Sequence, residues 1–247
     1  MRVLVQNRIN YKVFLLLFLG MLTAFGPFAT DMYLPSFPSM AEWFGTSSSM
    51  VQLSLTSCMI GLAVGQLFFG PLSDKYGRKI VLLWSLLLFI VATFWCIYSS
   101  DIYQFVAFRL LQGIAASGGI VISRSVSTDM FEGHELAKML AVIGSINGVA
   151  PVLAPVVGGA MTGIAGWKGI FGVLLLIGML ILFAAFYYQE SLPRERRVSS
   201  SFLHAFRNFK PLFGNRPYMG YMLQLGFAQA ALFANIASAP FIMQEHY

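Results

Sequence analysis

Long apolar segments separated by short polar connections make up most of the chain. Each segment is close to the ~20 residues that a helix needs to cross the ~30 Å hydrocarbon core of a bilayer. Because lipid offers the backbone no hydrogen-bond partners, such segments cross a membrane as helices. The pattern therefore predicts an all-α integral membrane protein with spans at 11–30, 50–69, 80–99, 103–122, 139–161, 167–188 and 218–242.

The longest polar connection, at 189–217, is rich in Arg and Ser and predicts a cytoplasmic linker. It separates a six-helix transmembrane half, residues 1–188, from a seventh helix at 218–247. The first six spans are compatible with two sets of three, and inverted three-helix repeats are typical of transporters. We expect 218–247 to be the first helix of a second half that is truncated here.

Composition supports the membrane interpretation. Apolar residues make up 57% of the 247 residues and charged residues only 11%, against about 25% charged residues in soluble domains. The net charge is +6, but the basic residues lie between apolar segments, which argues against nucleic-acid binding. Lipid is therefore the expected surroundings of most of the surface.

The basic residues also predict an orientation. Only Lys168 lies on the side of the membrane opposite the other bases, and Arg109 lies within a span. Because cytoplasmic connections carry the excess of Lys and Arg, the N-terminus is predicted to be cytoplasmic. The remaining bases fall on that side: Arg2, Arg8, Lys12, Lys75, Arg78, Lys79, Arg124, Lys138, Arg194, Arg196, Arg197, Arg207, Lys210 and Arg216.

Nothing in the sequence points to catalysis, a metal or a cofactor. His134, His204 and His246 are scattered and lack the spacing of a metal site or a triad. No GxxxxGK motif is present, which argues against ATP-driven pumping by this chain. Cys58 and Cys96 lie in apolar segments and are expected to be free packing residues.

Two charged residues in apolar segments are candidates for function. Asp31 ends the first segment, about 19 residues or ~28 Å of helix beyond Lys12, near the outer membrane face. It is either an interfacial acid or a site for a proton or a cationic substrate.

Arg109 lies about seven residues, or roughly 10 Å, inside the fourth segment. A charge at this depth needs a partner or a wet cavity, and Gln112 follows one turn later on the same helix face. We hypothesise that Asp31 and Arg109 share a polar network whose charge changes with proton uptake. The alternative is a purely structural buried pair.

Small residues and prolines mark two segments. The second and fifth each carry a pair of glycines four residues apart, Gly61/Gly65 and Gly144/Gly148, which favours close helix contact. Proline removes an intrahelical hydrogen bond and bends a helix. The fifth segment is thus predicted to pack closely against another helix. If the two halves of the protein rock against each other, it would also form a flexible interface between them. The residues that suggest this are Gly144, Gly148, Pro151, Pro155, Gly158 and Gly159.

The run 70–79, GPLSDKYGRK, is a charged connection between the second and third segments. Its Gly-Pro pair is expected to end the second helix, and Gly77 lets the chain double back.

Four motifs together resemble the major facilitator superfamily. The run 70–79 resembles the signature G-x-L-x-D-x-x-G-R-K between its second and third helices, and RLLQGIAAS at 109–117 resembles its fourth-helix motif R-x-x-Q-G. APVVGG at 154–159 is similar to the antiporter motif G-P-x-x-G-G, with Ala154 in place of the first Gly. TDMYLPSFP at 30–38 resembles the first-helix signature of drug:proton antiporters, most closely the bicyclomycin/chloramphenicol-resistance (Bcr/CflA) branch.

The resemblance implies two six-helix halves around a central cavity, in the cytoplasmic (inner) membrane of a bacterium. It implies export of small drugs in exchange for protons, driven by the proton gradient without a cofactor. Asp31 would be a coupling acid and Arg109, with Gln112, part of its network. A cytoplasmic latch between the halves would involve Gly70, Asp74, Gly77, Arg78 and Lys79.

Two alternatives remain open. A carrier for a metabolite would share the fold. A membrane sensor or assembly partner without transport activity would fit the short length of the chain.

Overall fold

The computed structural model describes residues 9–198 and 210–245. Arg2, Arg8, His204, Arg207 and His246 of the sequence analysis lie outside the described residues. The chain forms two compact units, Met1–Arg197 and Val198–Tyr247. The division falls inside the connection predicted at 189–217.

Helices connected by short turns form the described part of both units, so the all-α prediction is confirmed. The first unit contains α2 (Ile9–Asp31), η1 (Leu34–Ser36), α3 (Phe37–Phe44), α4 (Ser48–Tyr76), α5 (Arg78–Ile97), α6 (Ile102–Met130), α7 (Gly133–Tyr187) and η2 (Arg194–Arg196). The second contains α9 (Lys210–Gly214) and α10 (Arg216–Glu245), the predicted seventh helix.

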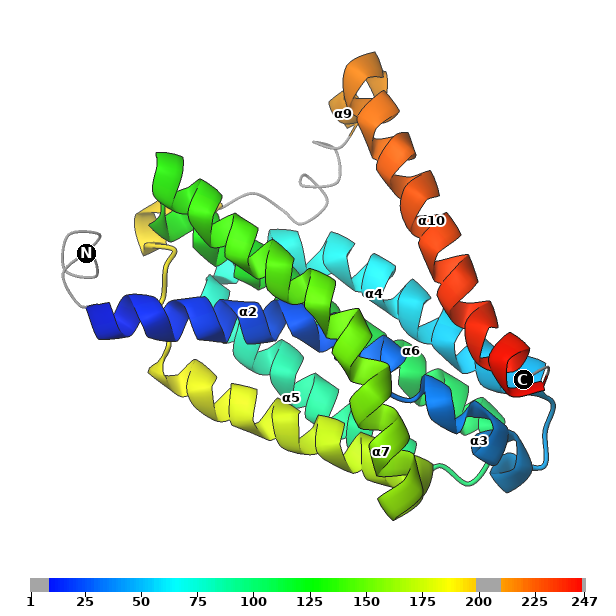
Figure 1. Ribbon diagram of the computed structural model, residues 1–247. Helices are drawn as coiled ribbons and strands as arrows, with labels where there is room; N and C mark the ends of the chain where they lie inside the picture. The colour runs from blue at the N-terminus through cyan, green and yellow to red at the C-terminus, as the bar shows by residue number, and fades with distance from the viewer. Residues whose placement is uncertain (1–8, 199–209, 246–247) are drawn as a thin grey trace. The chain divides into compact units, whose positions relative to one another are not determined.

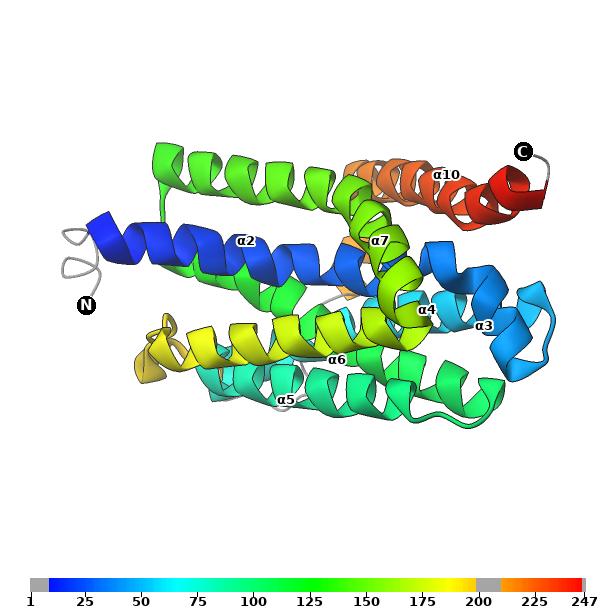
Figure 2. The ribbon, with the colours of Figure 1, turned by 60° about the horizontal axis from the view of Figure 1, so that its bottom comes forward.

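Five helical stretches in the described residues are long and apolar enough to cross a membrane, and all lie in the first unit. The last of them, α7, has 55 residues, or roughly 80 Å of helix, enough for two crossings. Gly166 interrupts it with a positive φ of 63°, at the point between the predicted fifth and sixth spans. Figure 2 shows that α7 changes direction along its length.

The two parts of α7 share one neighbour and differ in another. The first part runs along α2, and the last part runs along α5 and also contacts α2, where a Cβ atom on Gly178 would lie 3.6 Å from the Phe25 ring (Figures 1 and 2). The first unit is thus a six-span bundle made from five long helices.

One prediction about helix ends is wrong. The Gly70–Pro71 pair does not end the second helix, because α4 continues through both residues to Tyr76. Pro71 has no amide hydrogen to donate to the Leu67 carbonyl one turn earlier, a loss that membrane helices tolerate. The Ser73 hydroxyl donates to the Gly70 carbonyl at 2.8 Å in the next turn. The break comes at Gly77, whose φ of 103° favours glycine.

Glycines bring α4 and α6 into backbone contact. A side chain on Gly61 would overlap the Leu110 carbonyl, one on Gly65 would lie 2.7 Å from the Ile114 carbonyl, and one on Gly113 would overlap the Cys58 carbonyl. The close contact predicted for the Gly61/Gly65 pair is therefore present.

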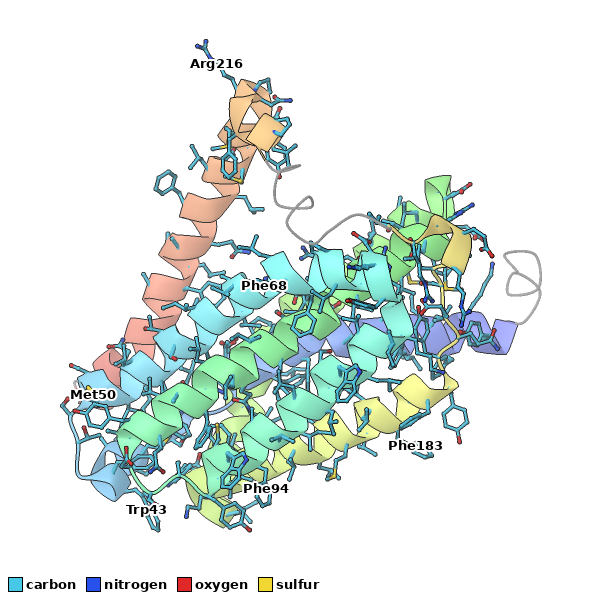
Figure 3. All side chains as sticks on the ribbon, turned by 180° about the vertical axis from the view of Figure 1, so that it is seen from behind. Trp43, Met50, Phe68, Phe94, Phe183 and Arg216 are labelled. Atoms are coloured by element: carbon cyan, nitrogen blue, oxygen red, sulfur yellow. The ribbon has the colours of Figure 1, made fainter. Side chains whose placement is uncertain are left out.

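Large apolar side chains cover the outside of the bundle. Trp43, Phe94 and Phe183 point away from the helices behind them (Figure 3). In water such a surface would be unfavourable, whereas lipid tails solvate it.

Candidate functional site

Arg109 is the largest side chain that is fully buried in the described residues. Its Nη1 donates a hydrogen bond to Gln112 Oε1 on the same helix, α6. Its Nη2 donates to the Ala29 carbonyl at 2.8 Å. That carbonyl belongs to the last turn of α2, where carbonyls lack intrahelical partners and the helix dipole is negative. The C-terminus of α2 thus compensates part of the Arg109 charge.

Two aromatic rings complete the surroundings of the guanidinium. Its central carbon lies 4.3 Å from the centroid of the Tyr33 ring and 5.6 Å from that of Phe171 on α7. Both rings are fully buried, and a desolvated cation–π contact of this kind stabilises a charge by about 2 kcal/mol.

Hydrogen bonds extend from Arg109 to neighbouring helices. Gln112 Nε2 donates to Thr93 Oγ1 of α5 at 2.7 Å, and the Tyr33 hydroxyl is 3.1 Å from Ser54 Oγ of α4. The sequence predicted Gln112 next to Arg109, and the structure places it there. Tyr33, Thr93 and Phe171 were not predicted; the signal for Thr93 is a hydroxyl inside an otherwise apolar segment.

Asp31 is the last residue of α2, and only 3% of its surface is exposed. Its Oδ1 is buried without a hydrogen-bond partner in the described part of the chain. Asp31 interacts electrostatically with Arg109, yet the Arg109 guanidinium donates its hydrogen bonds to Ala29 and Gln112. The two charges therefore interact through space near the end of α2. They do not form the direct ion pair that is the structural alternative in the sequence analysis. A buried carboxylate with a free oxygen can take up a proton or bind a cation.

The residues predicted in the fifth span occupy different surroundings in α7. A side chain on Gly158 would overlap the carbonyl of Met32, immediately after Asp31. Gly144 and Gly148 have nothing within 4 Å of the position of a Cβ atom in the described residues. Pro151 and Pro155 lie inside the helix, and its non-helical φ and ψ angles occur at Gly166 instead.

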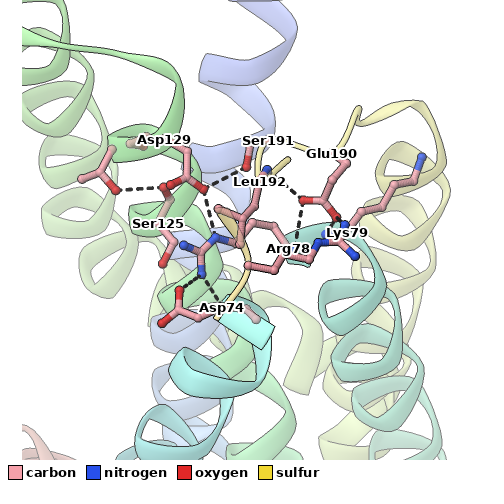
Figure 4. Close-up of polar contacts among 12 residues, drawn as sticks. Asp74, Arg78, Lys79, Ser125, Asp129, Glu190, Ser191 and Leu192 are labelled. Atoms are coloured by element: carbon pink, nitrogen blue, oxygen red, sulfur yellow. Dashed lines mark hydrogen bonds and ion pairs between the residues drawn. The ribbon is translucent and has the colours of Figure 1, made fainter. Parts of the chain in front are cut away.

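A second polar network lies at the end of the first unit that carries Gly77, the "Gly77 end" (Figure 4). The Arg78 side chain, 7% exposed, donates to Asp74 Oδ1 at 2.6 Å, to Ser73 Oγ at 2.6 Å and to Asp129 Oδ2 at 2.9 Å. Asp129, from the last turn of α6, also accepts a hydrogen bond from Ser191 at 3.1 Å. Arg78 therefore joins α4, α5, α6 and the chain after α7.

Glu190 and Lys79 cap each other's helices. The Glu190 carboxylate accepts hydrogen bonds from the amides of Arg78 at 2.9 Å and Lys79 at 3.2 Å, the first two residues of α5. The Lys79 ammonium donates to the Phe186 carbonyl in the last turn of α7 at 2.8 Å. Each charge complements the dipole of the helix end that it meets.

The Glu190 carboxylate also lies close to Gly77. A Cβ atom there would lie 2.5 Å from Glu190 Oε2 and 2.6 Å from Arg197 Nη2. The positive φ therefore favours glycine here, and any side chain would also displace the ends of the Glu190 and Arg197 side chains, which form an ion pair at 3.4 Å. Next to it, the Tyr188 hydroxyl donates to Ser191 Oγ at 2.8 Å, and burial raises the pKa of Tyr188, which keeps the phenol protonated.

The predicted latch residues differ in how far they are buried and bonded within the first unit. Arg78, Lys79 and Gly77 are engaged within the first unit, whereas the Asp74 side chain is 46% exposed. Gly70 lies inside α4, where a Cβ would make only an ordinary contact of 3.9 Å with Val121. Asp129, Glu190 and Ser191 were not predicted, because acids beside a polar connection look like ordinary solvated residues. No cluster of metal-ligating residues occurs in the described part of the chain.

Comparisons with known proteins agree with these features. The family model described as Major Facilitator Superfamily matches residues 16–247. The uncharacterized MFS-type transporter YdgK of Bacillus subtilis (strain 168) is 44% identical over 232 residues, which cover 93% of this chain and 58% of the relative. A bicyclomycin resistance protein homolog of Haemophilus influenzae (strain ATCC 51907 / DSM 11121 / KW20 / Rd) is 32% identical, with 96% of this chain and 60% of the relative covered.

Multidrug resistance protein D of Escherichia coli (strain K12) is 30% identical, with 92% of this chain and 57% of the relative covered. Among solved structures, a bacterial homolog of the human lysosomal transporter Spinster, inward-facing and unoccupied, matches with a TM-score of 0.74 and 20% identity. The match covers 97% of this chain and 57% of that one. The chain therefore spans somewhat more than half the length of these relatives.

Proposed function

We propose a function for this chain, which belongs to the major facilitator superfamily. The proposed function is that of a secondary transporter that exports small drug-like molecules in exchange for protons. This chain forms the N-terminal half of that transporter and the first helix of its second half. Relatives named for bicyclomycin, chloramphenicol and multidrug resistance support a drug as substrate. The second half supplies the opposite wall of the substrate cavity.

The observation that carries the proposal is Oδ1 of Asp31, which is buried beside the charge of Arg109 and has no hydrogen-bond partner among the described residues. Arg109 cannot lose its proton in a protein, so Asp31 is the member of the pair that changes charge. Protonation of Asp31 removes a buried negative charge and changes the electrostatic balance at the end of α2. The proton gradient then supplies the energy for export, without a cofactor.

At the Gly77 end, we assign the latch between the halves to Asp74. Its carboxylate is bonded to Arg78 at 2.6 Å but remains 46% exposed, so its exposed side can accept a base or a helix N-terminus of the second half. The distribution of bases supports an orientation with the N-terminus and the Gly77 end on the cytoplasmic side. Relatives from bacteria support a bacterial cytoplasmic membrane as its location.

Everted membrane vesicles from cells expressing the complete gene product test the proposal. Addition of a substrate drug is expected to release protons from energised vesicles, measured with a pH-sensitive dye. Asp31→Asn is expected to abolish this release, whereas Glu42→Gln, at an exposed acid of α3, retains it. Drug-induced proton release that is unchanged in Asp31→Asn would contradict the proposal. Release induced by metabolites and by no drug would favour the metabolite carrier.

A further inference from the structure

Gly158 touches the backbone immediately after Asp31. A Cβ atom at position 158 would overlap the Met32 carbonyl oxygen and come within 3.3 Å of the Met32 Cα. We propose that Gly158 is a positioning residue for Asp31: the missing side chain lets α7 press on the Met32 carbonyl and so fixes where the Asp31 carboxylate lies. The inference rests on the proposed function only for the use of Asp31 in proton coupling.

The end of α2 is held from two sides. On one side, Arg109 of α6 donates to the Ala29 carbonyl at 2.8 Å. On the other, Gly158 of α7 contacts the Met32 carbonyl. Asp31 lies between these two backbone contacts, so its main chain has little freedom to move while both helices stay in place.

Other glycines of α7 show that this contact is specific. A Cβ at Gly159 would meet only the Pro35 Cβ, at 4.0 Å, which is an ordinary contact. Gly148 has nothing within 4 Å in the part of the chain that the structure describes. The two adjacent glycines of APVVGG therefore differ: only the first requires the absence of a side chain in this structure.

A displaced Met32 carbonyl changes the electrostatic surroundings of Asp31. Two groups on neighbouring helices interact electrostatically with Asp31: Arg109 of α6 and Cys58 of α4. On α7 itself, the charged residue nearest to Gly158 along the chain is Lys168, ten residues later. Coulomb energies in a low-dielectric interior change steeply with distance. A methyl group at 158 thus alters the protonation of Asp31 without adding any charge.

The test measures Asp31 directly. Dicyclohexylcarbodiimide modifies protonated carboxyls in apolar surroundings, and peptide mass spectrometry of the purified complete protein quantifies the Asp31 adduct between pH 5 and 9. Gly158→Ala is expected to move the pH midpoint of labelling by about one unit, the size of effect that a changed neighbouring charge produces. Gly159→Ala is the matched control and is expected to keep the wild-type midpoint.

Coinciding midpoints for Gly158→Ala and wild type would overturn the proposal. If Gly158→Ala does not fold, Ala154→Gly replaces it, because Ala154 is fully buried one turn earlier on the same face. It is expected to move the midpoint further than Gly159→Ala does, and equal midpoints would again overturn the proposal. Because labelling does not require transport, a shifted midpoint in a protein that moves no drug would refute the proposed function alone.

Discussion

Arg109 donates a hydrogen bond to the Ala29 carbonyl across 2.8 Å, and this bond joins the first third of α6 to the end of α2. The guanidinium also lies against the Tyr33 and Phe171 rings, which contact each other edge to face. A planar group with several donors is needed to satisfy Ala29 and Gln112 together while stacking on aromatic faces. The position therefore requires the shape of arginine as well as its charge.

Arg109→Lys tests this requirement. An ammonium keeps the charge but cannot form both hydrogen bonds and both ring contacts from one position. We expect the variant to insert into the membrane and to lose drug efflux by at least about tenfold, which corresponds to the ~1.4 kcal/mol of a lost charged hydrogen bond. Efflux from loaded cells measures it, and Arg124→Lys, at an exposed arginine of the same helix, is the control. Wild-type efflux by Arg109→Lys would show that charge alone suffices.

The reciprocal caps of Glu190 and Lys79 predict losses of stability. Glu190→Ala removes the cap of α5 and an ion pair with Arg197 at 3.4 Å, so we expect a loss of about 1–2 kcal/mol. Lys79→Met removes only the bond to Phe186 and is expected to cost about 0.3–1 kcal/mol. Thermal unfolding in detergent compares the two variants. A larger loss for Lys79→Met than for Glu190→Ala would contradict this order.

The two acids that bind Arg78 are expected to respond differently to neutralisation. Asp129 is 18% exposed and Asp74 is 46% exposed. Asp129→Asn weakens the less exposed pair and should destabilise the protein by about 1–3 kcal/mol, whereas Asp74→Asn should cost about 1 kcal/mol or less. If Asp74 is the latch, its variant instead changes efflux and the populations of inward- and outward-facing states. Equal unfolding temperatures, together with unchanged efflux by Asp74→Asn, would contradict both assignments.

The apolar pattern predicted every long helix of the first unit, because membrane length and backbone satisfaction leave few other structures for such segments. It could not show that α4 passes through Pro71, since a proline can either end a helix or only bend it, and the packing around it decides which occurs. It placed Gln112 beside Arg109 because both lie on one helix. It missed Ala29, since a backbone carbonyl has no sequence signal, and Glu190, whose partners at the start of α5 lie more than 100 residues earlier.

The glycine pairs show the same limit and provide the last prediction. The sequence treats Gly61/Gly65 and Gly144/Gly148 alike, but Gly61 touches the Leu110 backbone while Gly148 faces open space in the described part of the chain. In the 247-residue chain, Gly61→Ala forces α4 away from α6 and is expected to destabilise it by about 1–3 kcal/mol. Gly148→Ala relieves the cost of a helical glycine and is expected to be neutral or stabilising by up to about 1 kcal/mol. Thermal unfolding followed by tryptophan fluorescence distinguishes them, and equal unfolding temperatures would mean that the contact between α4 and α6 is looser than the structure indicates.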